Sequence, residues 1–377
     1  MKFSYKHIFL FFVLMVLFLP IIQSFIPIVK EQTLKGFFET KAKPELNTND
    51  YFSGKYQEDY MLYINDALPL KATITRIYNQ TLFSFFKQTN VNDIQIGENG
   101  YLYERPYIKE YNGEQFNGSA LNIDKVKRLQ KINQHLETLG KKLIIVFAPG
   151  KASMFPQFLP SKFRIQKTDS TNYFVLKKEF NNTNLNFIDF RDYFIKYKDT
   201  STHTIMGKLG VHWTKYAAHL ASDSIIRMME RLTSTDIVDK VYKYNEVTGK
   251  PREPDDDIAQ SMNLLWPLNG DVYTYPVVDY ITENKVKPRV SVIADSYWWT
   301  INNNYIPSSQ FSEYYFMYYY KHTYDFEKEI SAEVTDDNLV QYINRSDYII
   351  LLATEANFNW FPYGFIEQFE RVYLQNK

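Results

Sequence analysis

Residues 143–148 read Leu-Ile-Ile-Val-Phe-Ala and are followed by Pro-Gly, and this stretch decides the fold class. An uninterrupted apolar run that ends at Pro and Gly is typical of a strand buried on both faces of a parallel sheet. Four other stretches are strand-like: 187–190, 290–294, 314–320 and 348–353. The sequence therefore predicts a sheet of about five parallel strands.

Helical patterns lie between the predicted strands. Residues 51–80 have apolar side chains at helical spacing on both sides of Pro69, which predicts two helices there. Further helices are predicted at 124–141, 172–181, 214–232 and 365–374. Strands that alternate with helices indicate a doubly wound α/β fold. In such folds the functional residues lie beyond the carboxyl ends of the strands, so those ends are where a site is expected.

The N-terminal segment has the character of a membrane anchor. Residues 8–29 carry no charge and, at about 1.5 Å per helical residue, are long enough to cross a hydrocarbon core of about 30 Å. Lys2 and Lys6 precede them, which predicts a cytoplasmic N-terminus with the remaining chain outside. A cleaved signal peptide is the alternative, although no small-x-small cleavage site follows. We expect three parts: cytoplasmic tip and anchor at 1–30, a polar stalk at 31–50 and one extracytoplasmic domain at 51–377.

The composition removes several classes of protein and site. The 377 residues include 43 Lys and Arg and 43 Asp and Glu without a basic block, so the protein is not expected to bind nucleic acid. The absence of cysteine excludes disulfides, zinc–thiolate sites and a cysteine nucleophile. Tyrosine and phenylalanine number 31 and 29, which suits either a carbohydrate-binding surface or a coding bias without function.

A serine follows one of the predicted strands directly. The apolar run 290–294 ends at Asp295-Ser296. A serine at this position can present its hydroxyl at the sheet edge, with backbone amides beyond it facing an oxyanion. Asp-Ser pairs also form ordinary turns and helix caps, so the motif by itself leaves both interpretations open.

One histidine is well placed to act as a general base. His212 follows the loop 207–210, which contains two glycines, and precedes Trp213 at the start of a long helix. A loop histidine held by a packed aromatic residue suits this role better than one on a helix face such as His219. No carboxylate stands at ligand spacing to these histidines or to His203, so no metal site is expected.

Together these motifs resemble a known family. Gly-Val-His-Trp-Thr at 210–214, Val-Ile-Ala-Asp-Ser at 292–296 and Tyr-Ile-Ile-Leu-Leu-Ala-Thr-Glu-Ala-Asn at 348–357 follow one another in the chain. Ala-Pro-Gly-Lys at 148–151 precedes them. Their order and spacing resemble the SGNH hydrolase-like domain of the alginate O-acetylation proteins AlgX and AlgJ, from about residue 51 to the C-terminus.

The resemblance implies a function and a location. It implies an SGNH-like extracytoplasmic enzyme, held by a single span in the bacterial inner membrane with its soluble domain in the periplasm. Such an enzyme acetylates an exopolysaccharide acceptor, with the acetyl donor supplied by an integral-membrane acyltransferase and no cofactor. Carried over by position, Ser296 is the nucleophile that becomes acetylated and His212 is the general base.

One position departs from the family pattern. The family has Asp-x-His-Trp, but Gly210 stands two residues before His212 in this chain. The group that accepts the hydrogen bond from the second ring nitrogen of His212 must therefore come from elsewhere: we expect a backbone carbonyl or a distant carboxylate, with Asp189 or Asp192 as the favoured source. The run Asp255–Asp257 is a further candidate, although such runs are usually solvated loops. A non-catalytic polysaccharide-binding or assembly module with a degenerate site, or an acetylesterase, remains an alternative function.

Six more residues are candidates for supporting roles. Asn357 follows the strand at 348–353 and, with the Ser296 amide, is a candidate oxyanion donor, with Asp295 in support. Lys151 follows Pro149-Gly150 at another strand end, where it could meet an anionic sugar. Three aromatic residues follow Ser296 and could line a glycan path or belong to the core: Tyr297, Trp298 and Trp299.

Overall fold

The computed structural model describes residues 4–36, 41–164, 170–325 and 330–374, which fall into two compact units. The first unit comprises residues 1–92 and 259–268, and the second comprises 93–258 and 269–377. Residues 37–40 of the expected stalk lie outside the described part of the chain. The boundaries expected at residues 30 and 50 stay a prediction.

The first unit is helical. Its first helix is 21 residues long and is long and apolar enough to cross a membrane. It contains Pro20 without ending there, but it ends at Phe25, before the expected boundary at Val29. Pro27 explains this early end, because proline disfavours helical geometry at the preceding residue. The helices of this unit are α1 (Tyr5–Phe25), α2 (Thr48–Ser53), α3 (Lys55–Ala67) and α4 (Lys71–Thr81).

The second unit contains the predicted parallel sheet. Its five parallel strands lie in the order β8, β7, β11, β3, β4. Two antiparallel strands, β9 and β10, extend the sheet beyond β8 and were not predicted. The strands are β3 (Lys142–Ala148), β4 (Asn186–Asp189), β7 (Arg289–Ala294), β8 (Glu313–Tyr318), β9 (His322–Asp325), β10 (Ile330–Glu333) and β11 (Tyr348–Thr354).

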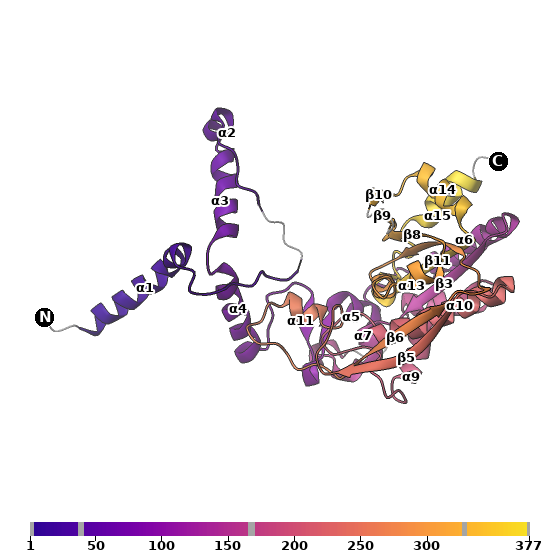
Figure 1. The fold of residues 1–377 in the computed structure, drawn as a ribbon, viewed down its shortest axis with the longest axis horizontal. Helices are drawn as coiled ribbons and strands as arrows, with labels where there is room; N and C mark the ends of the chain where they lie inside the picture. The colour runs from indigo at the N-terminus through magenta and orange to yellow at the C-terminus, as the bar shows by residue number, and fades with distance from the viewer. Residues whose placement is uncertain (1–3, 37–40, 165–169, 326–329, 375–377) are drawn as a thin grey trace. The chain divides into compact units, whose positions relative to one another are not determined.

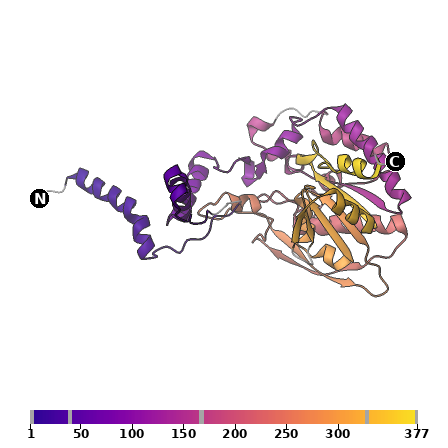
Figure 2. The same cartoon turned by 90° about the horizontal axis from the view of Figure 1, so that it is seen from above.

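Helices cover both faces of this sheet, as the doubly wound fold requires (Figures 1 and 2). On one face Ile145, Phe147 and Leu351 pack in a core with α6 (Ser119–Thr138), α8 (Asn172–Asn181), α14 (Asp336–Arg345) and α15 (Phe365–Phe369). On the other face lie α10 (Lys215–Thr233) and α12 (Tyr297–Asn302), and the Tyr348 hydroxyl donates to the Met229 carbonyl of α10. Burial on both faces explains why the central strands are apolar throughout.

Two hairpins lie outside the main sheet. Strands β1 (Ile94–Ile96) and β2 (Leu102–Glu104) pair around the turn at 97–100. Strands β5 (Asp239–Thr248) and β6 (Tyr273–Ile281) form a longer antiparallel ribbon, labelled in Figure 1. The chain between β5 and β6 carries the Asp255–Asp257 run. Short helices lie around the strand ends of the second unit: α5 (Arg105–Tyr111), α7 (Lys151–Met154), α9 (Phe190–Tyr197) and α13 (Ile306–Gln310). A further short helix, α11 (Asp257–Ser261), begins at the last aspartate of the run.

Candidate active site

Ser296 lies at the carboxyl end of β7, where the chain turns into α12. It occupies the N-cap position of α12, but its side chain makes no capping hydrogen bond. Instead, its Oγ lies 2.9 Å from Nε2 of His212. The serine hydroxyl is therefore directed at the histidine, and the helix-cap interpretation of the Asp-Ser motif does not describe this side chain.

The loop before α10 holds His212 in place. Trp213 is fully buried and packs edge-on against Tyr297, with ring centroids 5.2 Å apart. The Tyr297 hydroxyl donates to the Val211 carbonyl at 2.7 Å. The next residue, Thr214, caps α10 by accepting from the Ala217 amide. The histidine is thus fixed by contacts on both sides.

A carboxylate stands behind the histidine, and it belongs to Asp257. Its Oδ2 lies 2.7 Å from Nδ1 of His212, and its Oδ1 accepts from the Val211 amide at 2.8 Å. Because a carboxylate only accepts, Nδ1 carries the proton and Nε2 is left to accept from Ser296. Burial lowers the pKa of His212, but the charge and hydrogen bond of Asp257 outweigh it and raise that pKa above its ordinary value.

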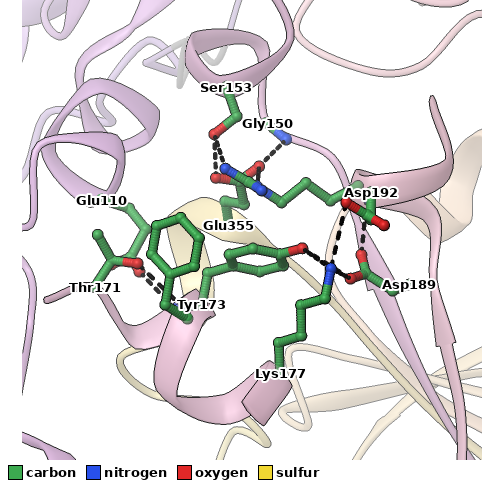
Figure 3. Close-up of polar contacts among 11 residues, drawn as sticks. Glu110, Gly150, Ser153, Thr171, Tyr173, Lys177, Asp189, Asp192 and Glu355 are labelled. Atoms are coloured by element: carbon green, nitrogen blue, oxygen red, sulfur yellow. Dashed lines mark hydrogen bonds and ion pairs between the residues drawn. The ribbon is translucent and has the colours of Figure 1, made fainter. Parts of the chain in front are cut away.

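The expectation that Asp189 or Asp192 orients His212 is therefore corrected. Asp189 lies at the end of β4, where it accepts from the Tyr173 hydroxyl at 2.8 Å and pairs with Lys177 at 3.0 Å. Asp192 pairs with the same lysine at 3.3 Å. Figure 3 shows both carboxylates turned toward Lys177. Through Lys177 they connect α8 to the start of α9, and they form no hydrogen bond with His212.

Gly210 explains how the carboxylate reaches the site from another part of the chain. A Cβ atom at this position would lie 2.6 Å from the Asp255 carbonyl oxygen and 2.9 Å from that of Pro254. The backbone of residues 254–255 thus occupies the space that a side chain at position 210 would need. The chain continues from there to Asp257, two residues later. The glycine at a position where the family has aspartate is the feature of the sequence that could have indicated an orienting carboxylate from another loop.

Lys151 does not lie where an anionic sugar would meet it. It is 1% exposed, and its ammonium group donates to the carbonyls of Lys208, at 3.1 Å, and Gly210. Burial lowers the pKa of Lys151 to about 7. The lysine fixes the loop that leads to His212, so the expectation that it binds substrate is wrong.

Two of the three aromatic residues after Ser296 belong to the core. Tyr297 and Trp298 are buried, and Trp298 donates from Nε1 to the Tyr314 hydroxyl. They cannot line a glycan path. Trp299 is half-buried and packs edge-on against Phe316 and Tyr324, with centroids 5.0 and 4.9 Å apart.

Asp295 is buried and organises the strand ends. Its carboxylate accepts from the Thr354 amide at 2.7 Å, the Asn357 side chain at 2.8 Å and the Tyr297 amide at 3.1 Å. Burial raises the pKa of this carboxyl, and the hydrogen bonds oppose that rise. Asp295 thus ties the end of β7 to the end of β11 and holds Asn357 near Ser296.

Sequence reasoning missed Tyr319, which lies beside the serine. Its hydroxyl lies near the side chains of Ser296 and Asn357 and interacts with both. Burial raises the pKa of Tyr319, so the hydroxyl keeps its proton at neutral pH. The tyrosine follows β8, and only the order of strands in the sheet brings it to Ser296.

A buried ion pair braces the neighbouring strand ends. Glu355, directly after β11, accepts from the Gly150 amide at 3.0 Å and from Nε of Arg191 at 2.9 Å. It also accepts from the Ser153 hydroxyl (Figure 3). These contacts connect the loops after β3 and β11, which carry Lys151 and Asn357.

A family model matches the middle of the chain. The family model described as the SGNH hydrolase-like domain of the acetyltransferase AlgX matches residues 94–289, which include His212 and Asp257 and end before Ser296. No curated protein sequence matches the chain.

Among solved structures, the O-acetyltransferase domain of Pseudomonas putida AlgJ is 13% identical with a TM-score of 0.46, covering 74% of this chain and 98% of that one. Bacillus cereus PatB1 is 12% identical with a TM-score of 0.43, covering 69% and 95%. Pseudomonas aeruginosa AlgX is 10% identical with a TM-score of 0.40, covering 75% and 70%.

The family match extends over more than half of the chain and contains the histidine with its carboxylate partner. The fold around it is the predicted α/β sheet with helices on both faces. The chain belongs to the family of SGNH hydrolase-like acetyltransferase domains typified by AlgX.

Proposed function

We propose that the protein is an O-acetyltransferase that acetylates a cell-surface or secreted polysaccharide through an acetyl-serine intermediate. The observation that carries the proposal is the hydrogen-bonded series from Asp257 through His212 to Ser296, with 2.7 and 2.9 Å between the paired atoms. A serine whose proton is accepted by an oriented imidazole is an activated nucleophile.

In the first step, Nε2 of His212 takes the Ser296 proton while Oγ attacks the carbonyl carbon of an acetyl donor. The histidine then returns this proton to the leaving group, which leaves acetyl-Ser296. Asp257 accepts from Nδ1 throughout and stabilises the imidazolium. The Ser296 amide and the Asn357 side chain are the candidate donors to the oxyanion.

In the second step, a sugar hydroxyl attacks the acetyl carbon while His212 takes its proton. The ester bond to Ser296 breaks, and Oγ recovers a proton from the histidine. The product is an acetylated sugar and free enzyme. Water in place of the sugar would give acetate, which is the esterase reaction of the same residues.

The test is acetylation of the full-length protein in detergent by an aryl acetate, followed by intact-mass analysis. We expect one acetyl group on the wild type and none on Ser296→Ala. Ser308→Ala removes an exposed serine and should label like the wild type. Equal labelling of Ser296→Ala would contradict the assignment. Release of acetate without acetylated sugar, when oligosaccharide is added, would indicate an esterase.

We further propose that α1 anchors the protein in a bacterial inner membrane, with the second unit in the periplasm. Its length and apolar character support an anchor, and Lys2 and Lys6 before it support a cytoplasmic N-terminus. An integral-membrane acyltransferase would then supply the acetyl donor. Carbonate-washed membranes should retain the full-length protein, and recovery of a processed soluble form would contradict this location.

A further inference from the structure

Two aromatic rings that the acetyl-transfer steps do not use lie beside Ser296. The hydroxyl of Tyr319 lies near the side chains of the serine and Asn357 and interacts with both. Trp360 stacks on Tyr319, with centroids 5.5 Å apart and planes at 19°, and donates from Nε1 to Oδ1 of Asn357 at 3.1 Å. Trp360 is nevertheless 46% exposed. An open aromatic surface therefore borders the nucleophile.

These rings are held in position before any substrate arrives. Tyr319 and Tyr320 have φ of 47° and 56°, in the left-handed region that bulky residues disfavour. Such conformations persist only where the surroundings fix them, and they concentrate at functional sites. The Tyr319 amide donates to the Ala294 carbonyl at 2.9 Å, at the end of β7. Tyr363 packs edge-on against both Tyr319 and Trp360, with centroids 5.6 and 5.7 Å away.

The charges around the site disfavour an anionic ligand. Three carboxyl groups act on the charge of His212: Asp257, Glu104 and Asp295. The cations that reach the adjoining loops are already engaged: Arg191 pairs with Glu355 at 2.9 Å, and two lysines direct their ammonium groups to backbone carbonyls. Lys151 donates to Lys208 and Gly210, and Lys125 donates to Asn359 at 2.8 Å and to Phe358. A uronate carboxylate would approach like charges here.

We propose that Tyr319 and Trp360 form the acceptor subsite and that this subsite takes an uncharged sugar ring of the polysaccharide. The proposal rests on the proposed acetyl transfer and adds the chemical class of the acceptor. The apolar C–H face of a pyranose packs on an aromatic ring without any charge, and polar groups at the edge fix its orientation. A sugar on Trp360 places the polysaccharide beside Ser296.

The test measures binding without chemistry, in full-length Ser296→Ala protein in detergent. Neutral tetrasaccharides of several linkages, among them cellotetraose, maltotetraose and chitotetraose, are compared by calorimetry with tetragalacturonate and tetramannuronate. We expect at least one neutral tetrasaccharide to bind, and to bind more tightly than either uronate. Adding Trp360→Ala should weaken that binding about tenfold or more.

Trp266→Ala provides the matched control, because Trp266 is also exposed, at 63%, and lies in the first unit. It should leave binding unchanged. If Trp360→Ala unfolds, Trp360→Phe is used in its place, because it keeps an aromatic ring. Its affinity for the neutral tetrasaccharide should lie between that of the Ser296→Ala protein with Trp360 intact and no detectable binding. Tighter binding of a uronate, binding of no neutral sugar, or equal affinities for the two tryptophan variants would overturn the subsite. Acetyl labelling of wild-type Ser296 is measured separately, so its failure would contradict the proposed function and not the binding result.

Discussion

Two carboxylates border the Ser296–His212 pair, and they come from regions that reach the site in different ways. Asp295 is the neighbour of Ser296 in sequence, yet its side chain turns to Thr354, Asn357 and Tyr297. Asp257 lies 39 residues before Ser296, between β5 and β6, and it contacts His212 directly. The carboxylate that is next to Ser296 in sequence therefore connects the strand ends, whereas the carboxylate that acts on His212 comes from a distant loop.

The largest effect is expected from Asp257→Asn. Asparagine has a single accepting oxygen, and the Val211 amide that donates to Asp257 would hold it, so the NH2 group would face Nδ1. His212 would then lose the tautomer and the charge that make it a base. Turnover should fall roughly ten-thousandfold, as for the aspartate of other serine triads. The acetylation rate with an aryl acetate measures it, and Asp256→Asn is the control from the same run. A loss of less than about tenfold would show that Asp257 is not the orienting group.

Asp295→Asn should instead reduce stability. Its Oδ2 accepts from the Thr354 amide, the Asn357 side chain and the Tyr363 hydroxyl, and an amide nitrogen there would face donors. Leaving buried donors unpaired costs about 3 kcal/mol of unfolding free energy. The thermal unfolding midpoint should fall by about 5 °C or more. Asp257→Asn should leave that midpoint nearly unchanged, and the reverse order of stabilities would reverse the roles assigned to the two carboxylates.

Restoring the family aspartate should damage this site. Because a Cβ at Gly210 would meet backbone atoms of residues 254–255, Gly210→Asp must displace the segment that carries Asp257. A displacement of about 1 Å can cost about a hundredfold in rate, so we expect a loss of that order. Gly249→Ala is the control, because no atom lies within 4 Å of its Cβ position. A gain in turnover for Gly210→Asp would mean that Asp257 performs the family role poorly.

The contrast between these two regions also shows what the sequence could predict. The central strands were predictable because burial on both faces makes 143–148, 290–294 and 348–353 apolar throughout. Ser296 was predictable because it follows the end of a strand, and His212 because it follows a loop at the start of a helix. Strand β5 gave no such signal, since most of its residues are exposed and its sequence is largely polar.

The remaining site residues depend on tertiary contacts. Asp257 was one of three neighbouring aspartates, and only the approach of residues 254–255 to Gly210 selects it. Tyr297 and Trp298 follow Ser296 but point into the core, because α12 packs on the sheet. Tyr319 reaches Ser296 because β8 pairs with β7, and sequence cannot give that pairing order.

The smallest effect concerns the pH at which His212 becomes a base. Acetylation requires a neutral imidazole, so the rate should rise with pH through the His212 pKa, which is raised above 6.5. In the residual activity of Asp257→Asn, burial remains and the main cause of the rise is gone, so the midpoint should move to lower pH. Glu104 contributes charge without a hydrogen bond to the imidazole, so Glu104→Gln should move the midpoint in the same direction by less. Rate–pH profiles of the three proteins measure this order. A midpoint that does not fall in Glu104→Gln would mean that the charge of Glu104 does not act on the imidazole, and the argument for an uncharged acceptor would lose part of its electrostatic support.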